Sequence, residues 1–141
     1  MDERGQGTAE LLFVVMILAL LLFSAFGLGQ GVVLKHGLDV GTEKAARVLS
    51  INPADFAYAE SLIRSEVDGN LLGGEYGSQV VVRLYDAVLD AEISPADLAI
   101  APFGYRFRVQ AELPWQANVP FLDLQGRVLE ATHYGIVERV Q

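Results

Sequence analysis

The sequence predicts an α+β protein, in which a long apolar N-terminal α-helix precedes a small antiparallel β-sheet domain with one or two helices. Three observations lead to this fold class. Residues 11–28 form an almost unbroken apolar run. Apolar residues then recur at helical spacing to about residue 67, and from residue 78 they alternate with polar residues. A period of two is typical of a strand with one buried face.

The apolar run is long enough to cross a membrane. Only Ser24 interrupts it before Phe26, and no charged residue lies between Glu10 and Lys35. A hydrocarbon core of about 30 Å needs about 20 such residues. Thirteen of residues 11–28 are Leu, Ile, Val or Phe, and together they favour insertion by about 6 kcal/mol. A cleaved signal peptide fits less well, because the first four residues are not basic and the apolar core is too long.

Glu10 is the chemically unusual residue, because it adjoins the apolar helix. Two interpretations stay open from chemistry alone. It is either an acid in the headgroup region that favours a helix N-terminus, or a carboxylate that meets a cationic partner inside an apolar assembly. The flanking charges of Arg4 and Lys35 balance, so the positive-inside rule gives no orientation.

Several glycines follow the apolar run, and their spacing includes Gly27-xxx-Gly31 and Gly37-xxx-Gly41. Such pairs allow close helix approach, so these four glycines are candidate helix-packing residues. Each glycine also weakens a helix by about 1 kcal/mol relative to alanine. Three interpretations compete: a packing face between subunits, a melted or bent stretch, and a loose hinge. We favour the first two together, with a helix that resumes or continues over residues 38–50.

A second helix is predicted over residues 53–67. Asn52 is its expected N-cap, with Pro53 in the first turn and Asp55 beside the positive end of the dipole. Its expected buried face consists of Phe56, Ala59, Leu62, Ile63 and Val67. A similar signature, Ser94-Pro95-Ala96-Asp97, predicts a short helix that ends before Pro102. Shared capping chemistry explains the similarity better than a repeat does.

Alternation predicts strands over residues 80–85 and 105–113, a short strand within residues 87–93, and one strand or a pair within residues 126–140. The expected inner positions are Val80, Val82 and Leu84, then Tyr105, Phe107, Val109, Ala111 and Leu113, and finally Leu129, Ala131, His133 and Val137. Three or four antiparallel strands with a helix across one face are sufficient to bury a core.

Composition excludes several function classes. With 18 acidic against 10 basic residues and a net charge of −8, the chain lacks the basic surface that grips nucleic acid. It has no cysteine, which excludes disulfides, thiol nucleophiles and cysteine-ligated metals. His36 and His133 are too far apart in sequence to indicate a metal site.

No catalytic pattern is recognisable either. Asp86, Asp90, Glu92 and Asp97 lack the spacing of a calcium loop and are interpreted as a solvated acidic edge. The glycines of residues 73–77 lack the Lys-Ser/Thr of a phosphate loop. Trp115 is expected in the core or an interface. The sequence therefore predicts no enzyme, no cofactor and no metal.

Residues 4–12, Arg-Gly-Gln-Gly-Thr-Ala-Glu-Leu-Leu, resemble the start of a type IV prepilin, above all in the TadE-like pilin family. Members of this family have a short leader that ends in Gly, then four residues, then Glu and an apolar helix. Here the Gly is Gly5 and the Glu is Glu10. The Ala45-Ala46-Arg47 segment and the C-terminal strands are also similar to the family, whereas residues 51–104 are not diagnostic.

The resemblance implies a leader over residues 1–5, cleaved by prepilin peptidase between Gly5 and Gln6 or else retained. Residues 6–50 would form the membrane and assembly helix, and residues 51–141 the globular domain. The implied function is a structural subunit of a Tad or type IV filament that polymerises with itself. The alternative is a membrane-anchored minor pilin or accessory protein of pilus assembly.

In the family, the glutamate neutralises the N-terminal amine of a neighbouring subunit. If the leader stays on, Arg4 of the same or a neighbouring chain becomes the natural cation for Glu10, because a carboxylate in an apolar interior needs a partner. The implied partners are copies of the chain, the prepilin peptidase, the pilus assembly machinery and the membrane before assembly. The expected locations are the cell membrane and an extracellular filament.

Overall fold

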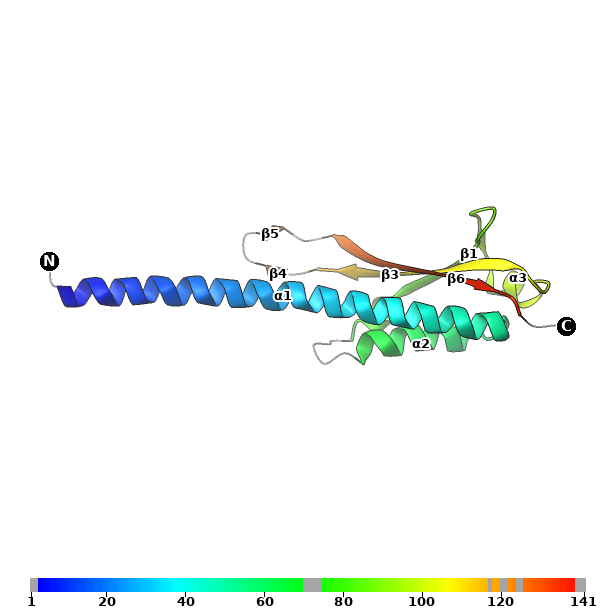
Figure 1. Ribbon diagram of the computed structural model, residues 1–141, viewed down its shortest axis with the longest axis horizontal. Helices are drawn as coiled ribbons and strands as arrows, with labels where there is room; N and C mark the ends of the chain where they lie inside the picture. The colour runs from blue at the N-terminus through cyan, green and yellow to red at the C-terminus, as the bar shows by residue number, and fades with distance from the viewer. Residues whose placement is uncertain (1–2, 70–74, 117, 120–121, 124–125, 139–141) are drawn as a thin grey trace.

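A computed structural model describes residues 3–69, 75–116, 118–119, 122–123 and 126–138. The molecule is α+β, as predicted, and one helix runs along its whole length (Figure 1). In chain order the elements are α1 (Glu3–Ile51), α2 (Phe56–Asp68), the 3-10 turn η1 (Gly77–Gln79), β1 (Val81–Asp86), β2 (Glu92–Ile93), α3 (Pro95–Ala99), β3 (Arg106–Trp115), β4 (Asn118–Val119), β5 (Leu122–Asp123) and β6 (Arg127–Ile136).

The main sheet has four antiparallel strands in the order β2-β1-β3-β6. Leu84 of β1 pairs with Val109 of β3, and Val109 pairs with His133 of β6. The predicted alternation is confirmed, because Phe107, Val109, Ala111 and Leu113 are fully buried. Residues 126–140 supply one long strand rather than two, and the short strand predicted within residues 87–93 is only two residues long.

The second half of α1 completes the core of the domain. It lies between the sheet and α2, which cover opposite sides of it (Figure 1). Its buried apolar residues are Leu34, Leu38, Ala45, Ala46 and Leu49. At the end of α1, Ser50 binds β6 and the segment that follows this strand: the Ser50 carbonyl accepts from Glu138 N–H at 2.8 Å, and the Ser50 Oγ accepts from Ile136 N–H at 3.3 Å.

The glycine-rich part of α1 is helical without interruption, so the expectation of a melted stretch or hinge is wrong. Gly31, Gly37 and Gly41 are buried. A Cβ on Gly31 would lie 2.6 Å from Trp115 Cζ2, and one on Gly41 would lie 2.8 Å from the Cα of Ile63 in α2. For Gly31 and Gly41 the close approach is therefore made within the chain, not between subunits. Tertiary packing of this kind outweighs the weak helix propensity of glycine.

The second helix begins later than predicted. Asn52 does not cap it, because the Asn52 N–H donates to Val48 O at 2.8 Å and so continues the hydrogen-bond pattern of α1. Pro53 follows in the turn, and α2 begins at Phe56 after Asp55, whose side chain makes no capping hydrogen bond. The predicted buried face is confirmed for Ala59, Ile63 and Val67.

The capping prediction is correct for α3, where the side chains and backbone of Ser94 and Asp97 form a reciprocal capping box. The Ser94 hydroxyl, which donates to Asp97 Oδ2 at 2.7 Å, and then the Ser94 N–H hold the pKa of Asp97 below its usual value. The two proline-containing signatures therefore do not share capping chemistry in the folded chain, since only the second forms a cap.

Gly41→Ala should lower the free energy of unfolding by about 1–3 kcal/mol, because the added methyl meets backbone atoms of α2 that cannot rotate away. Denaturant unfolding of the full chain in neutral micelles, followed by the fluorescence of the single tryptophan, measures the change. Gly29→Ala is the matched control: its Cβ meets nothing within 4 Å, so it should be neutral or stabilising. Equal stability of both variants would contradict the packing described for Gly41.

Candidate membrane and assembly segment

The first half of α1 projects beyond the domain as an isolated helix (Figure 1). We call residues 7–28 the apolar rod. None of its side chains is buried, and large ones are well exposed, including Leu22 at 71% and Phe23 at 67%. Soluble monomers rarely expose apolar patches of more than a few hundred Å². The rod therefore requires an apolar environment that the described part of the chain does not supply.

The dimensions of the rod match a bilayer. A helix of residues 7–28 measures about 33 Å at about 1.5 Å per residue, against a hydrocarbon core of about 30 Å. The α1 helix is thus long and apolar enough to span a membrane. Within the apolar run, Ser24 Oγ donates to Leu20 O at 2.8 Å, so this polar group is satisfied within the helix.

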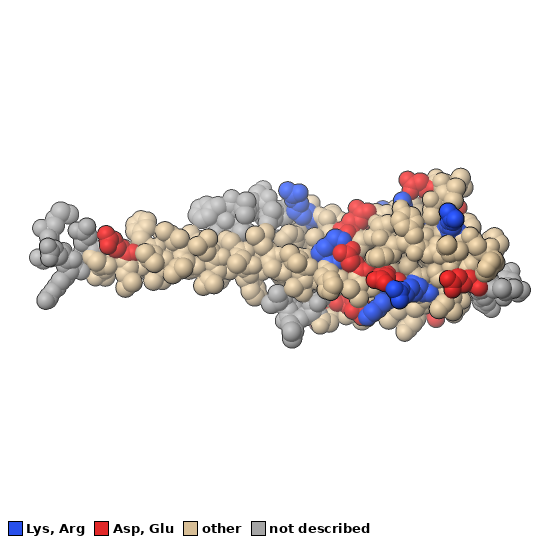
Figure 2. Space-filling view, viewed as in Figure 1, with Lys and Arg blue, Asp and Glu red and all other residues tan. Residues whose placement is uncertain are grey.

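Charged groups are excluded from most of the rod. Figure 2 shows an uncharged stretch between the N-terminal end of the molecule and the domain, where acidic and basic residues gather. Between residues 7 and 34 the only charged residue is Glu10, which is exposed. The next charges, Lys35 and Asp39, form an ion pair one helical turn apart at the start of the domain.

The predicted processing residues Gly5 and Gln6 lie in the first turns of α1. Arg4 is also helical, but the side chains of residues 3–6 lie outside the described part of the structure. Gly27 is half-buried near the end of the rod, and it is the one candidate packing glycine that is not buried in the domain. The structure therefore separates the candidate residues into an N-terminal group and a domain-packing group.

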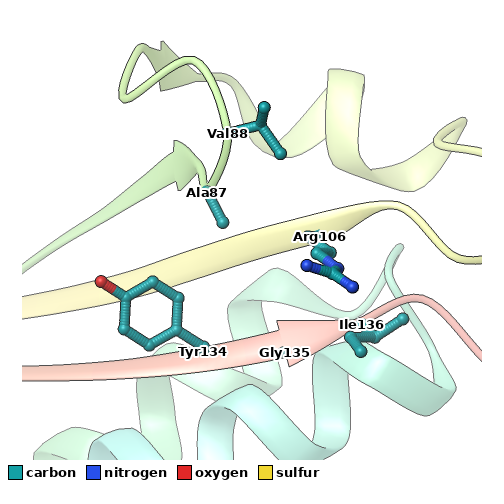
Figure 3. Close-up of a pocket in the computed structure, with 6 residues that line it drawn as sticks. All are labelled: Ala87, Val88, Arg106, Tyr134, Gly135 and Ile136. Carbon is teal, nitrogen blue, oxygen red and sulfur yellow. The ribbon is translucent and has the colours of Figure 1, made fainter.

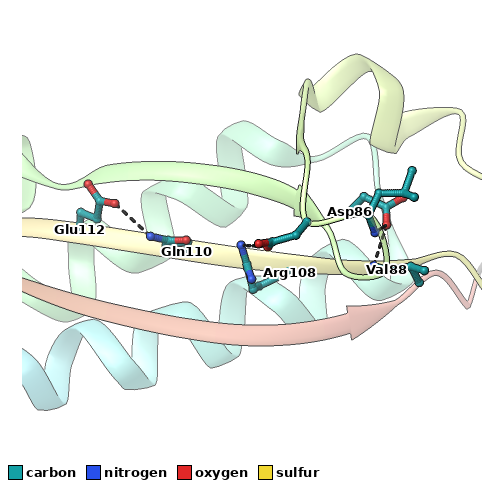
Figure 4. Close-up of polar contacts among 7 residues, drawn as sticks. Asp86, Val88, Arg108, Gln110 and Glu112 are labelled. Carbon is teal, nitrogen blue, oxygen red and sulfur yellow. Dashed lines mark hydrogen bonds and ion pairs between the residues drawn. The ribbon is translucent and has the colours of Figure 1, made fainter.

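The acidic stretch after β1 contains one structural carboxylate, which corrects its interpretation as a uniformly solvated edge. Asp86 is only 8% exposed, and its Oδ1 accepts from the N–H groups of Val88 and Leu89 at 2.7 and 2.8 Å (Figure 4). Tyr105 donates its hydroxyl proton to Asp86 Oδ2 at 2.7 Å. The carboxylate therefore organises the turn between β1 and β2.

These hydrogen bonds shift the pKa values of both Asp86 and Tyr105. The bond from Tyr105, followed by those from the two backbone N–H groups, lowers the pKa of Asp86. The same bond, with a smaller effect of burial, raises the pKa of Tyr105 to about 12. Among the described residues, no group of three or more His, Asp or Glu side chains is placed to hold a metal ion. His133 lies half-buried on the inner side of β6.

Comparison of the chain with protein-family models, with curated proteins and with solved structures found no match. Function is therefore inferred from the chain's own geometry. Sequence reasoning located the apolar rod and Glu10, but it did not single out the outward-facing side chains of the sheet, among them Arg106, Arg108 and Tyr134. Their alternation with buried residues was a visible signal that they share one face.

Single cysteines introduced into this cysteine-free chain should map the membrane boundary. In intact membranes, Leu18→Cys should resist a membrane-impermeant maleimide added to either side, because position 18 lies inside the rod. His36→Cys, which replaces an exposed side chain at the start of the domain, should react from one side only. Equal labelling of both variants would show that the rod does not lie in lipid.

Tyr105→Phe should lower the thermal midpoint of the domain by a few degrees near neutral pH. The Tyr105 pKa is raised on folding, so its contribution is complete below about pH 10 and is lost as the pH rises toward 12. The Asp86 pKa is lowered, so its contribution is present above about pH 4 and is lost as the pH falls through the lower folded value.

The difference in thermal midpoint between the wild type and Tyr105→Phe should therefore be largest between these limits and should shrink at both extremes. Circular dichroism melts across the pH range measure it. Tyr58→Phe, at an exposed position on α2, is the matched control and should follow the wild type. A difference independent of pH would show that the lost interaction is not with a carboxylate.

Proposed function

We propose that this protein is a pilin-like structural subunit that is held in the cell membrane by the apolar rod and then polymerises through it into an extracellular filament. The observation that carries the proposal is a single continuous helix whose second half is buried in the domain, while the side chains of residues 7–28 are not buried in the described structure. The prepilin-like residues 4–12 at the start of that helix add support.

The rod suits both of the environments that the proposal gives it. In the bilayer its apolar side chains contact lipid, and in a filament they contact the rods of neighbouring subunits. Lipid tails and packed side chains are similarly apolar, so the hydrophobic effect favours neither strongly. Van der Waals packing and polar pairing then decide the equilibrium. Gly27, near the end of the rod, gives neighbouring helices a place for close approach.

Glu10 supplies the polar pairing in this proposal. A carboxylate buried among apolar rods costs several kcal/mol unless a cation meets it. Cleavage between Gly5 and Gln6 would provide the free amine of Gln6, whereas a retained leader would provide Arg4. Six residues of α-helix place Arg4 about 240° around the axis from Glu10, so residues at this spacing are not neighbours on one helix. If the leader is retained, the partner of Glu10 is therefore assigned to Arg4 of an adjacent subunit.

The proposal includes prepilin peptidase and the pilus assembly machinery as partners, because cleavage of the leader would require the peptidase and the rod must be drawn from the bilayer. Mechanical shearing of cells, followed by mass spectrometry of the released fibres, tests it. The chain should be recovered in the sheared fraction, and its N-terminal peptide should begin at Gln6 if the leader is cleaved or at Met1 if it is retained.

Recovery of the chain only in the membrane fraction would overturn the filament proposal. That result would favour the second candidate, a membrane-anchored minor pilin or accessory protein that does not form the bulk fibre. The exposed rod is compatible with a permanent anchor, so the sheared fraction is the measurement that separates the two functions.

Glu10→Gln should leave the amount of protein in the membrane unchanged but lower the fibre yield at least tenfold, because the amide keeps the shape of the side chain and loses its charge. Quantitative blotting of the sheared and membrane fractions measures both effects. The matched control is Glu43→Gln, which removes a surface carboxylate paired with Arg47 in the domain half of α1. Normal fibre yield from Glu10→Gln would contradict the charge pairing.

A further inference from the structure

The outer face of the sheet, on the side away from α1, contains a pocket with a volume of about 360 Å³. It is bounded by the loop after β1 and by the adjoining ends of β3 and β6 (Figure 3). Its lining residues are Ala87, Val88, Arg106, Tyr134, Gly135 and Ile136. A volume of this size is at the lower end of the range for small-molecule sites, about 300–1,000 Å³.

The walls of the pocket are fixed by the backbone. The Asp86 carboxylate holds the turn that carries Val88, and the Ala87 N–H donates to Arg106 O at 3.1 Å. Arg106 and Ile136 are direct cross-strand partners, so their side chains stand side by side. Gly135 lies against the core, where an added Cβ would clash with the Phe107 ring. The backbone that carries the lining side chains is thus fixed before any ligand arrives.

The pocket presents one available cation. Arg108, the next outward-facing residue of β3, is already engaged by Asp90 at 2.7 Å, and its guanidinium lies 4.6 Å from the centre of the Tyr85 ring. Arg83 is 4.0 Å from Glu112. Arg106, by contrast, forms no ion pair with any residue that the structure describes. Its guanidinium lies among Val88, Ile136 and the Tyr134 ring, which are largely apolar surfaces (Figure 3).

We propose that this pocket binds a small organic monocarboxylate, with the carboxylate on Arg106 and an apolar or aromatic body against Val88, Tyr134 and Ile136. The planar guanidinium matches a carboxylate through two parallel hydrogen bonds. One available cation among apolar walls favours a singly charged ligand with a hydrophobic part over phosphate, which carries more charge and no apolar surface. The site does not include any residue of the rod, so the ligand-binding proposal is tested separately from the filament function.

Methyl NMR of the full chain in neutral maltoside micelles tests the site, because Val88 and Ile136 place labelled methyl groups in the pocket. Phenylacetate is the probe. It should shift the Val88 and Ile136 signals saturably and leave the buried Ile63 signal unchanged. Phenylacetamide, which keeps the ring but has no charge, and inorganic phosphate, which has charge but no ring, should each bind at least tenfold more weakly.

Arg106→Gln should weaken phenylacetate binding at least tenfold, since a charge-assisted pair is lost. Arg127→Gln, at an exposed position on the same strand as Tyr134 but outside the pocket, should retain the wild-type affinity. Absence of a saturable shift with phenylacetate would overturn the proposal. Equal affinity of Arg106→Gln and the wild type, or equal binding of phenylacetamide, would overturn it as well, because binding would then depend on the apolar surface or the micelle alone.

Discussion

The packing of the second half of α1 between the sheet and α2 organises the rest of the molecule. Leu34, Leu38 and Leu49 from this half enter the same core as Ile63 of α2 and Phe107 of β3. Because the helix is continuous, fixing its second half also fixes the direction in which the apolar rod leaves the domain. A rod presented rigidly can meet other rods in a defined register, which a flexible tether would not allow.

Small residues make this packing possible. Gly31 and Gly41 let Trp115 and the backbone of α2 approach α1 more closely than any side chain would permit. These glycines lower the helix propensity of α1 but allow closer contacts inside the subunit. The net effect is favourable only where burial is extensive. In the rod, whose side chains no described part of the chain buries, the corresponding positions are dominated by large apolar side chains. The two halves of α1 thus have different compositions because they have different neighbours.

The two faces of the sheet have different surroundings. The inner face is closed by α1, whereas the outer face keeps arginines and tyrosines that align across β1, β3 and β6. Tyr85, Arg108 and Tyr134 lie in one row, and Arg106 begins the next. The Asp86 turn fixes the loop above them, and this loop bounds the pocket beside Arg106. The proposed ligand pocket therefore lies on the opposite side of the sheet from α1.

The sequence by itself determined the apolar rod, the alternating strands and the isolated Glu10, because hydrophobic run length, a period of two and a lone charge are local patterns. It also determined most of the buried face of α2 and the capping of α3. Only the tertiary structure decided that α1 continues through its glycines, that Asn52 extends α1, and that Asp86 is buried. Those outcomes depend on contacts with Trp115, Ile63 and Tyr105, which come from distant segments of the sequence. A local sequence pattern does not contain the energy of such long-range contacts.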